Sequence, residues 1–293
     1  MNGLILLDKP QGFTSFKAVA VLRRIYGTKR VGHTGTLDPL ATGVLPILIG
    51  RATRLSSYVL EADKRYIAGI RLGVTTDSLD ITCRVVSEGE VNVTDEQLSE
   101  ALTHFTRTYD QIPPMYSAIQ VNGVRLYDLA RQGKEVQREP RRVTIHQIKL
   151  LNRQGDEFLI EVSCSKGTYI RSLANDIGKY LGCGATVMSL RRISTAGFSI
   201  GSCFTLEQIE ADPEGCLTSA EKAVPDFREV HIAPTQSKRF LNGASLSTDR
   251  LRFVSDAKDK ELLKIFCNGV FLGLAEYSAE YSEITTKCVI FEE

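Results

Sequence analysis

The sequence predicts a mixed α and β body, residues 1–228, followed by a small β module, residues 229–293. In the body, short apolar runs of strand type alternate with amphipathic stretches of helical spacing. Between residues 207 and 229, seven acidic side chains meet two basic ones and prolines recur, which is typical of a domain boundary. Beyond it, two apolar runs flank Asn268-Gly269, a dipeptide that favours a tight β-hairpin.

Capping residues and glycines predict where the helices of the body begin and end. Thr14 or Ser15 can cap the first helix, which Gly27 ends. Thr94 with Gln97 has the spacing of a capping box, which opens a later helix. Helices are expected at residues 14–26, 52–61, 94–105 and 168–181, and a further helix is expected to start at a second capping box, residues 205–208. Strands are expected at residues 3–7, 44–49, 66–72, 158–164 and 187–193. A loop is expected at residues 28–43 and a tight hairpin at residues 121–124.

Composition excludes several classes of protein. The 293 residues carry 36 Lys or Arg against 35 Asp or Glu, so the overall charge gives no sign of a polyanionic partner. No apolar run reaches the roughly 18 residues that a membrane span needs, and residues 1–12 lack the basic start of a signal peptide. The seven cysteines show no C-x-x-C spacing, so we interpret them as buried apolar residues rather than zinc ligands or disulfides. We therefore expect a cytoplasmic globular protein.

Positive charge concentrates in two segments. Residues 9–60 hold eight Lys or Arg and one carboxylate, and residues 125–153 hold eight cations against three carboxylates. Such local patches fit a nucleic-acid-binding surface, although ordinary solvated helix faces explain the charge equally well. Arg141 and Arg142 are the candidates for contacts to a nucleic-acid backbone, in a nucleic-acid-binding insertion expected at about residues 112–145.

Asp38 is the single carboxylate of the first segment, within a glycine-rich loop at residues 32–43. Pro39 holds the backbone of Asp38 extended, and the glycines let the chain turn tightly and approach a ligand. A carboxylate in a rigid, cation-rich loop can serve as a nucleophile on an anionic substrate. The alternative is a turn-forming Asp that caps nearby backbone. No Gly-Lys-Ser/Thr follows, so this is not a phosphate-binding Walker motif.

The Asp38 loop belongs to an ordered set of motifs that runs over nearly the whole chain. The set is Leu7-Asp8-Lys9-Pro10-x-Gly12-x-Thr14-Ser15, Gly32-His33-x-Gly35-x-Leu37-Asp38-Pro39-x-Ala41-x-Gly43, Lys64-Arg65-Tyr66, Thr76-Asp77-Ser78-Leu79-Asp80, Pro113-Pro114-x-Tyr116-Ser117-Ala118, Gly167-Thr168-Tyr169-Ile170-Arg171 and Leu190-Arg191-Arg192. Together these motifs closely resemble the tRNA pseudouridine-55 synthase (TruB) family. The sequence departs from that pattern at Cys83, where a small turn residue such as Gly is expected.

The resemblance implies an α+β fold with a mixed, mainly antiparallel central sheet and flanking helices. Residues 269–273 are similar to a PUA-type RNA-binding module, which implies a small PUA-like β domain at the C-terminus. The implied reaction cleaves the N1–C1′ bond of uridine 55 in the tRNA T-loop, turns the uracil over and rejoins it through C5. It implies no cofactor and no metal, tRNA as partner, no protein partner, and a monomer.

The resemblance also implies roles for individual residues. Asp38 would be the nucleophile or base, Tyr66 would stack on the uracil, and Arg171 would pair with Asp38. Asp80 would be a second carboxylate that orders Arg171. A bidentate contact from Arg171 to a carboxylate would offset the unfavourable position of a cation in the first turn of a helix.

The remaining candidates concern substrate binding. His33 would fill the space that the extruded base leaves, Leu190 would form an apolar wall, and Tyr169 and Lys9 are further binding candidates. A target base inside a folded loop has to be extruded and held against an aromatic face, which suits Tyr66. Taken singly, Tyr66 and Leu190 are equally compatible with ordinary core packing, and His33 with a turn.

Two other functions remain open at this stage. A non-catalytic tRNA-binding or tRNA-folding factor would use the same surfaces, but it gains nothing from one carboxylate among cations. A base-removing glycosidase would need two carboxylates flanking the bond, and the loop supplies only Asp38. No candidate catalytic residue lies beyond Leu190, so the C-terminal module is expected to add RNA affinity and no chemistry.

Overall fold

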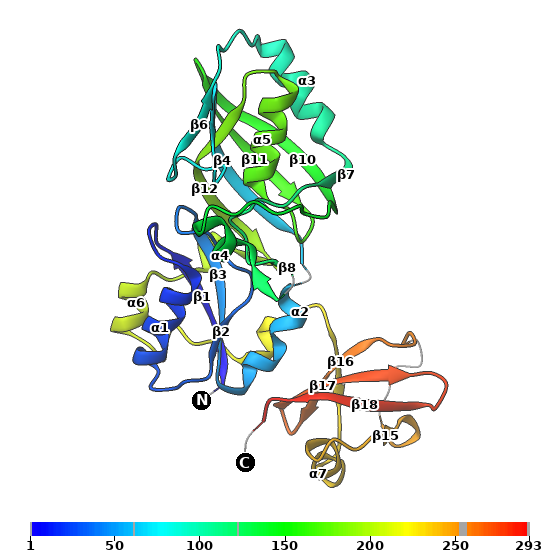
Figure 1. Cartoon of the computed structure of the whole chain (residues 1–293). Coiled ribbons are helices and arrows are strands. Elements are labelled where there is room, and N and C mark those ends of the chain that lie inside the picture. The colour runs from blue at the N-terminus through cyan, green and yellow to red at the C-terminus, as the bar shows by residue number, and fades with distance from the viewer. Residues whose placement is uncertain (1, 61, 122, 252–256, 292–293) are drawn as a thin grey trace.

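The computed structural model of the chain (Figure 1) describes residues 2–60, 62–121, 123–251 and 257–291. These residues form a nine-stranded sheet with helices packed on it, and a separate five-stranded sheet near the C-terminus. The large sheet is mixed and mainly antiparallel, so the predicted α+β fold with a small C-terminal β domain is confirmed. Among the described helices, none is long and apolar enough to cross a membrane.

The large sheet runs through the whole body. Its order is β1 (Gly3–Lys9), β3 (Thr42–Ile49), β12 (Ala185–Thr195), β4 (Lys64–Leu72), β11 (Glu157–Cys164), β10 (Arg141–Gln154) and β7 (Thr108–Gln111), with β2 (Val31–His33) on β3 and β13 (Phe198–Ser199) on β12. Every pairing is antiparallel except β12 with β3. That parallel pair joins β1 and β3 to the other strands of the sheet, directly beside the Asp38 loop.

Gly43 explains why the two strands can meet there. It pairs with Arg192 in the parallel register and has a φ of 101°. A Cβ at this position would lie 2.2 Å from the carbonyl oxygen of Arg192. Only glycine combines this backbone conformation with such a close approach. Close packing of β3 against β12 therefore requires glycine at position 43, the last glycine of the Asp38 loop.

The helices cover the sheet and position its loops. They are α1 (Ser15–Ile25), α2 (Ser56–Leu60), α3 (Asp95–Phe105), α4 (Leu126–Arg131), α5 (Ile170–Tyr180), α6 (Leu206–Ala211) and α7 (Pro234–Leu241). Thr14 caps α1, and both expected capping boxes, on α3 and α6, are present. Helices α3 and α5 pack beside each other on the β4–β11–β10 part of the sheet (Figure 1). Two small hairpins complete the body, β5 (Val74–Thr76) with β6 (Val85–Glu88) and β8 (Gln120–Val121) with β9 (Val124–Arg125).

Several local expectations need correction. The loop expected at residues 28–43 contains β2 and the first residues of β3, because a three-residue strand in a glycine-rich stretch leaves no periodic signal. The helix expected at residues 52–61 is a 3-10 helix, Gly50–Leu55, followed by α2; Glu61 lies outside the described residues. The hairpin expected at 121–124 is formed by β8 and β9, with Asn122 outside the described residues.

The C-terminal module is built around its own sheet. The strand order is β14 (Arg228–His231), β16 (Leu262–Cys267), β17 (Val270–Ser278), β18 (Glu283–Val289) and β15 (Leu246–Ser247), and α7 packs beside it. The hairpin expected at Asn268-Gly269 connects β16 and β17, whereas α7 was not expected. The boundary predicted between residues 228 and 229 falls at the start of β14.

The seam between body and module is an apolar cluster with polar contacts at its edge. Leu4 and Leu48 of the body share a buried cluster with Phe266, Phe271 and Ile290 of the module. Three side chains of the body donate hydrogen bonds to carbonyl oxygens at the end of β18 and just beyond it. These are Asn2 to Ile290 (3.1 Å), Arg51 to Phe291 (2.9 Å) and Arg54 to Val289 (2.9 Å).

Candidate active site

A pocket of about 300 Å³ opens where the Asp38 loop faces the first turn of α5. Its walls come from the Asp38 loop, the end of α2, strands β4 and β12, and the segments before α4 and α5. The lining residues are Gly35, Thr36, Leu37, Asp38, Leu60, Lys64, Tyr66, Ser117, Ala118, Gly167, Thr168, Tyr169, Ile170, Arg171, Leu190 and Arg192. Of the predicted site residues, Asp38, Tyr66, Tyr169, Arg171 and Leu190 are therefore brought together here.

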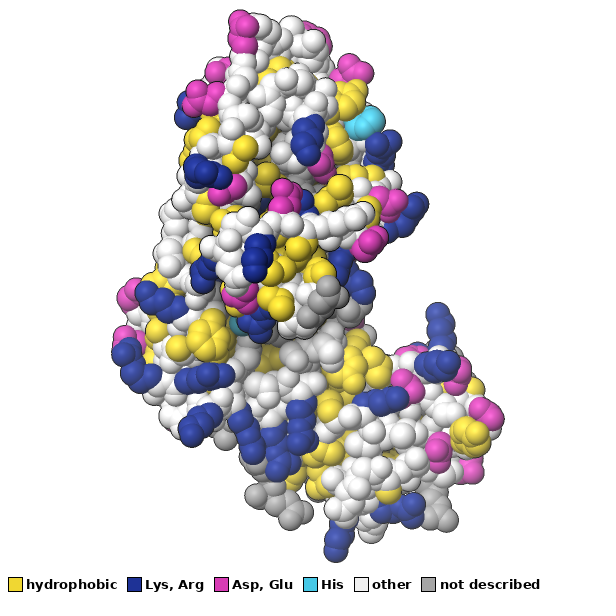
Figure 2. Space-filling view, viewed as in Figure 1, with side chains coloured by type: hydrophobic (Ala, Val, Ile, Leu, Met, Phe, Trp, Pro, Cys, Tyr) yellow, Lys and Arg dark blue, Asp and Glu magenta, His cyan; other side chains and the backbone are white. Residues whose placement is uncertain are grey.

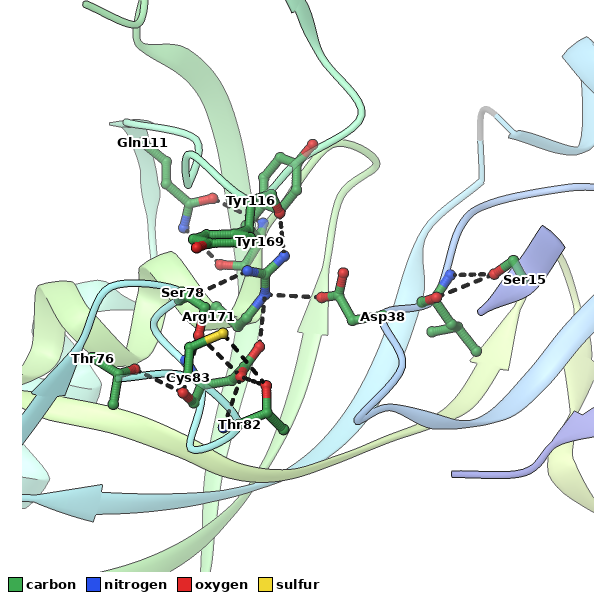
Figure 3. Close-up of polar contacts among 12 residues, drawn as sticks. Ser15, Asp38, Thr76, Ser78, Thr82, Cys83, Gln111, Tyr116, Tyr169 and Arg171 are labelled. Atoms are coloured by element: carbon green, nitrogen blue, oxygen red, sulfur yellow. Dashed lines mark hydrogen bonds and ion pairs between the residues drawn. The ribbon is translucent and has the colours of Figure 1, made fainter. Parts of the chain in front are cut away.

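Arg171 and Asp38 form an ion pair inside this pocket (Figure 3). The Nε of Arg171 lies 2.8 Å from Oδ2 of Asp38; the arginine side chain is 4 % exposed and the aspartate 34 %. The two terminal nitrogens of Arg171 donate to the carbonyl oxygens of Ser78 and Tyr116, each at 2.7 Å. The bidentate contact expected from the sequence is therefore wrong, because backbone carbonyls occupy both terminal nitrogens and leave Nε for the carboxylate.

Asp80 is a second carboxylate close to the guanidinium of Arg171. Its Oδ2 lies 3.9 Å from Nε of Arg171, and its side chain is 8 % exposed. The other oxygen, Oδ1, accepts hydrogen bonds from Ser78 Oγ and from the backbone N–H of Thr82, each at 3.1 Å. The tight turn that carries Asp80 includes Leu79 at a φ of 64°. Asp80 is thus a buried carboxylate of fixed orientation beside Arg171, the residue next to which the resemblance placed it.

The departure at Cys83 lies just beyond this turn. The Sγ of Cys83 is 4.0 Å from the hydroxyl of Thr82, which itself bonds to Asp80 (Figure 3). All seven cysteines of the chain are free thiols. Among the described residues, no group of three or more His, Cys, Asp or Glu side chains is arranged to hold a metal ion.

The Asp38 loop is held from two sides. On one side, Ser15 of α1 accepts the backbone N–H of Leu37 at 2.9 Å. On the other, Arg192 of β12 donates from Nε to the carbonyl of Val44 (2.7 Å) and from Nη2 to that of Gly35 (3.1 Å). The side chain of Arg192 is almost completely buried. These contacts fix the backbone on either side of Asp38, and they give Arg192 a place in the site that the sequence analysis missed.

Tyr66 and Leu190 form part of the apolar wall of the pocket. They stand on neighbouring strands, and Tyr66 pairs with Arg192 in the β4–β12 register. Both side chains are buried and belong to the main core as well as to the pocket. Burial raises the pKa of the Tyr66 phenol, although Arg192 acts in the opposite sense. The ring therefore meets the pocket as a neutral aromatic surface.

Lys9 and His33 do not line the pocket. The Nζ of Lys9 is fully buried and donates to the carbonyls of Pro10 (2.9 Å) and Phe13 (2.6 Å), which shapes the turn before α1. Burial lowers the pKa of Lys9 to about 8, against the opposing effect of Asp38. Burial also lowers the pKa of His33 on β2, so its imidazole is neutral at pH 7. Lys9 thus supports the turn before α1, whereas Nδ1 of His33 is buried without a hydrogen-bond partner among the described residues.

Arg141 and Arg142 lie outside the pocket on the exposed end of β10. Arg142 is 3.9 Å from the carboxylate of Asp110 on β7, and both side chains are mostly exposed. Arg141 is close enough to Tyr169 to oppose the rise that burial causes in the pKa of that phenol. The structure also adds Lys64, Ser117 and Thr168 to the pocket lining. Each belongs to one of the sequence motifs, but none of these three residues had an assigned role.

Solved structures with the same architecture define the class of protein. A chain of a Cbf5–Nop10–Gar1 complex superposes with a TM-score of 0.74 at 27% sequence identity, covering 99% of this chain and 84% of that one. A chain of an H/ACA ribonucleoprotein bound to a substrate RNA that contains 2′-deoxyuridine shares the fold with a TM-score of 0.76 at 24% identity, covering 99% and 85%. The fold is that of the pseudouridine synthases, with a PUA-like sheet at its C-terminus.

Sequence comparisons narrow the class to a family. The model of the TruB family pseudouridylate synthase N-terminal domain matches residues 23–170, and that of the tRNA pseudouridylate synthase B C-terminal domain matches residues 171–224. The tRNA pseudouridine synthase B of Azoarcus sp. (strain BH72) is 44% identical over 283 residues, 95% of this chain and 92% of the relative. That of Escherichia coli O9:H4 (strain HS) is 40% identical over 296 residues, covering 96% and 92%. The chain belongs to the TruB family of pseudouridylate synthases and is an isomerase.

Proposed function

We propose that this enzyme converts uridine 55 in the T-loop of tRNA to pseudouridine. In this reaction the N1–C1′ bond breaks, the uracil turns over and a C5–C1′ bond forms, while hydrogen is lost from C5 and a proton is gained at N1. The relatives named tRNA pseudouridine synthase B support tRNA as the substrate. Because reactants and product are isomers, the step needs no co-substrate.

The observation that carries the proposal is the Asp38–Arg171 ion pair at the pocket. A carboxylate that is one-third exposed is accessible to a substrate, and a buried arginine 2.8 Å away fixes its direction. In the proposed mechanism Asp38 acts as nucleophile or base at the glycosidic centre. A protein that only binds RNA has no use for an accessible anion at this point, since the anion repels phosphate.

Base flipping is the second part of the proposal. A uracil stacked inside a T-loop cannot reach a carboxylate in a pocket of about 300 Å³ unless it leaves the stack. Tyr66 and Leu190 supply the aromatic and aliphatic surfaces that would receive the extruded base. Asp80 would keep Arg171 in place during the reaction, and Tyr169 would contact the flipped nucleotide from the start of α5.

Recognition of the rest of the RNA is assigned to exposed cations and to the C-terminal module. The molecule is hollowed between body and module, and Lys and Arg side chains lie on both sides of this hollow (Figure 2). Arg141 and Arg142 would contact the RNA backbone from the tip of β10. Lys9 would support the turn before α1, and His33 would fill the space that the extruded base leaves. We propose that the enzyme works as a monomer in the cytoplasm, where its substrate is.

The test is release of tritium from a tRNA transcript labelled at C5 of uridine. Wild-type protein is expected to release the label of uridine 55, and a transcript with cytidine at that position is expected to release none. Asp38→Asn keeps the size of the side chain and is expected to bind the transcript without releasing tritium. The matched control is Asp226→Asn, an exposed site outside the pocket lining, with release at the wild-type rate. Substantial pseudouridine formation by pure Asp38→Asn protein would overturn the assignment.

A further inference from the structure

The helix that carries Arg171 begins without a side-chain cap. Tyr169 is the N-cap residue of α5, and its side chain makes no capping hydrogen bond. The usual N-cap residues Ser, Thr, Asp and Asn fix the first turn by accepting a backbone N–H. Arg171 stands in that first turn, so whatever fixes this turn also fixes the distance between Arg171 and Asp38.

Gln111, the last residue of β7, contacts this turn from outside the helix (Figure 3). Its Oε1 accepts the backbone N–H of Tyr169 at 2.9 Å, and its Nε2 donates to the backbone carbonyl of Tyr169 at 3.2 Å. The side-chain amide thus pairs with both backbone groups of one residue, as a neighbouring strand would. Gln111 is 1 % exposed, so water does not compete for these bonds.

The amide of Gln111 is itself held in one orientation. Its Nε2 also donates to the hydroxyl of Tyr109 at 2.7 Å, and that hydroxyl lies 3.4 Å from Oδ2 of Asp176 on α5. The next residue of the chain continues the link, because Ser172 Oγ donates to the carbonyl of Ile112 at 2.9 Å. Three residues at the end of β7 and just beyond it, Tyr109, Gln111 and Ile112, therefore contact α5 or its N-cap residue at three places.

We propose that Gln111 is a positioning residue for the isomerase reaction, acting through the first turn of α5. It sets where Arg171 and the ring of Tyr169 stand relative to Asp38, and it touches neither substrate nor the reacting atoms. The segment that follows it contributes the carbonyl of Tyr116, which accepts Nη2 of Arg171. Gln111 thus joins the helix that carries Arg171 to the segment that holds Nη2 of its guanidinium. This inference rests on the proposed roles of Asp38 and Arg171.

Two substitutions test it. Gln111→Met keeps the length of the side chain and removes both contacts to Tyr169. Gln111→Glu keeps the acceptor for the N–H and loses the donor to the carbonyl. In single-turnover reactions at saturating tRNA we expect the Met variant to lose about 10²-fold in rate and the Glu variant less, since a shift of about 1 Å in a reacting group has effects of this size. The dissociation constant for tRNA is expected to stay within about threefold. Gln147→Met, at an exposed position of β10, is the matched control and is expected to react at the wild-type rate.

A double-mutant cycle with Arg171→Lys separates positioning from general loss of structure. If Gln111 acts through Arg171, the Gln111 substitution should cost only a few-fold once Arg171 has been replaced, because coupled residues are not additive. Rates of Gln111→Met within threefold of wild type, or full additivity in the cycle, would overturn the proposal. Should the Met variant fail to fold, Gln111→Glu completes the same cycle. Activity of Asp38→Asn would instead refute the proposed function, so the two failures are distinguishable.

Discussion

The pocket and the seam between body and module both use arginines that donate to backbone carbonyls, but they use them differently. In the pocket, Arg171 and Arg192 are almost completely buried, and four carbonyl oxygens fix their guanidinium groups. At the seam, Arg51 and Arg54 lie nearer to solvent, and residues of both parts share a buried apolar cluster. The pocket therefore depends on directed hydrogen bonds and the seam on apolar burial. Substitutions should affect catalysis in the first region and stability in the second.

The sharpest test of the pocket is Arg171→Lys. Lysine keeps the charge, but its donors all lie on one nitrogen, which cannot reach Asp38 and the carbonyls of Ser78 and Tyr116 as the three separate nitrogens of the planar guanidinium do. We expect the single-turnover rate to fall about 10²–10³-fold, equivalent to about 2.7–4 kcal/mol of transition-state stabilisation. Arg24→Lys, where the side chain is 73 % exposed on α1, should react like wild type at saturating tRNA. Near-normal rates in Arg171→Lys would show that charge alone is sufficient.

The matching test of the seam is Phe271→Ala. Phe271 is 8 % exposed and packs against Phe266 at a ring distance of 5.4 Å. Removal of a buried phenyl ring is expected to lower the free energy of unfolding by about 3 kcal/mol, measured by urea denaturation. The rate at saturating tRNA should change less than threefold. Val270→Ala, at the exposed neighbouring position, should cost less than about 0.5 kcal/mol. A large loss of rate with intact stability in Phe271→Ala would contradict the division between the two regions.

Three carboxylates of the body differ in the groups that lie beside them. Asp38 and Asp80 have Arg171 beside them, whereas Asp176 on α5 is largely buried and burial raises its pKa from 3.8 to about 6. A raised pKa in the folded state means that the contribution of Asp176 to stability is fully present below pH 4 and is lost as the pH rises through 6. The full difference corresponds to about 3 kcal/mol, and partial exposure to water reduces it to about 1 kcal/mol.

Asp176→Asn should therefore be more stable than wild type by about 1 kcal/mol above pH 7, and the difference should vanish near pH 4. Denaturation of both proteins at several pH values between 4 and 8 measures it. A constant difference over this range would show that Asp176 does not titrate as a buried carboxyl group. The amide can still accept a hydrogen bond from Tyr109, so the contact to β7 is kept.

The smallest effects are expected at the exposed arginines. Neutralising Arg141 and Arg142 together should weaken tRNA binding and lower the salt dependence, since each lost phosphate contact reduces the log–log slope by about 0.7–0.9. The rate at saturating tRNA should be unchanged, because neither side chain lines the pocket. Binding measured by filter retention at several salt concentrations gives the slope. A slope equal to that of wild type would remove this end of β10 from the interface.

The parts that the sequence predicted share local causes. Strand β1, helices α1 and α3 and the hairpin of β16 and β17 follow from periodicity, capping residues and a turn dipeptide, all of which lie within a few neighbouring positions. Strands β7 and β10 were not expected, because the long β10 is exposed over most of its length and carries few of the apolar positions that mark a buried strand.

The site was predicted where a motif determines the residue and missed where distant segments meet. Asp38, Tyr66 and Arg171 converge on one pocket, as the resemblance implied. The single Nε contact could not be read from the sequence, since its cause is a pair of carbonyls from segments 55 and 93 residues away from Arg171. Nor could the inward direction of Arg192 be predicted, because its neighbour Arg191 instead pairs with Asp8 at 2.7 Å.

The seam also determines when the body can finish folding. Leu4 of the first strand and Ile290 beyond the last strand belong to the same buried cluster, so residues almost a whole chain apart must meet to complete it. During synthesis, this face of the body remains uncovered until the ribosome has released the last strand. Contacts of such long sequence separation form slowly, and an apolar face exposed for that time favours aggregation. The body therefore depends on strand β18 and on the residues just beyond it to cover this apolar face.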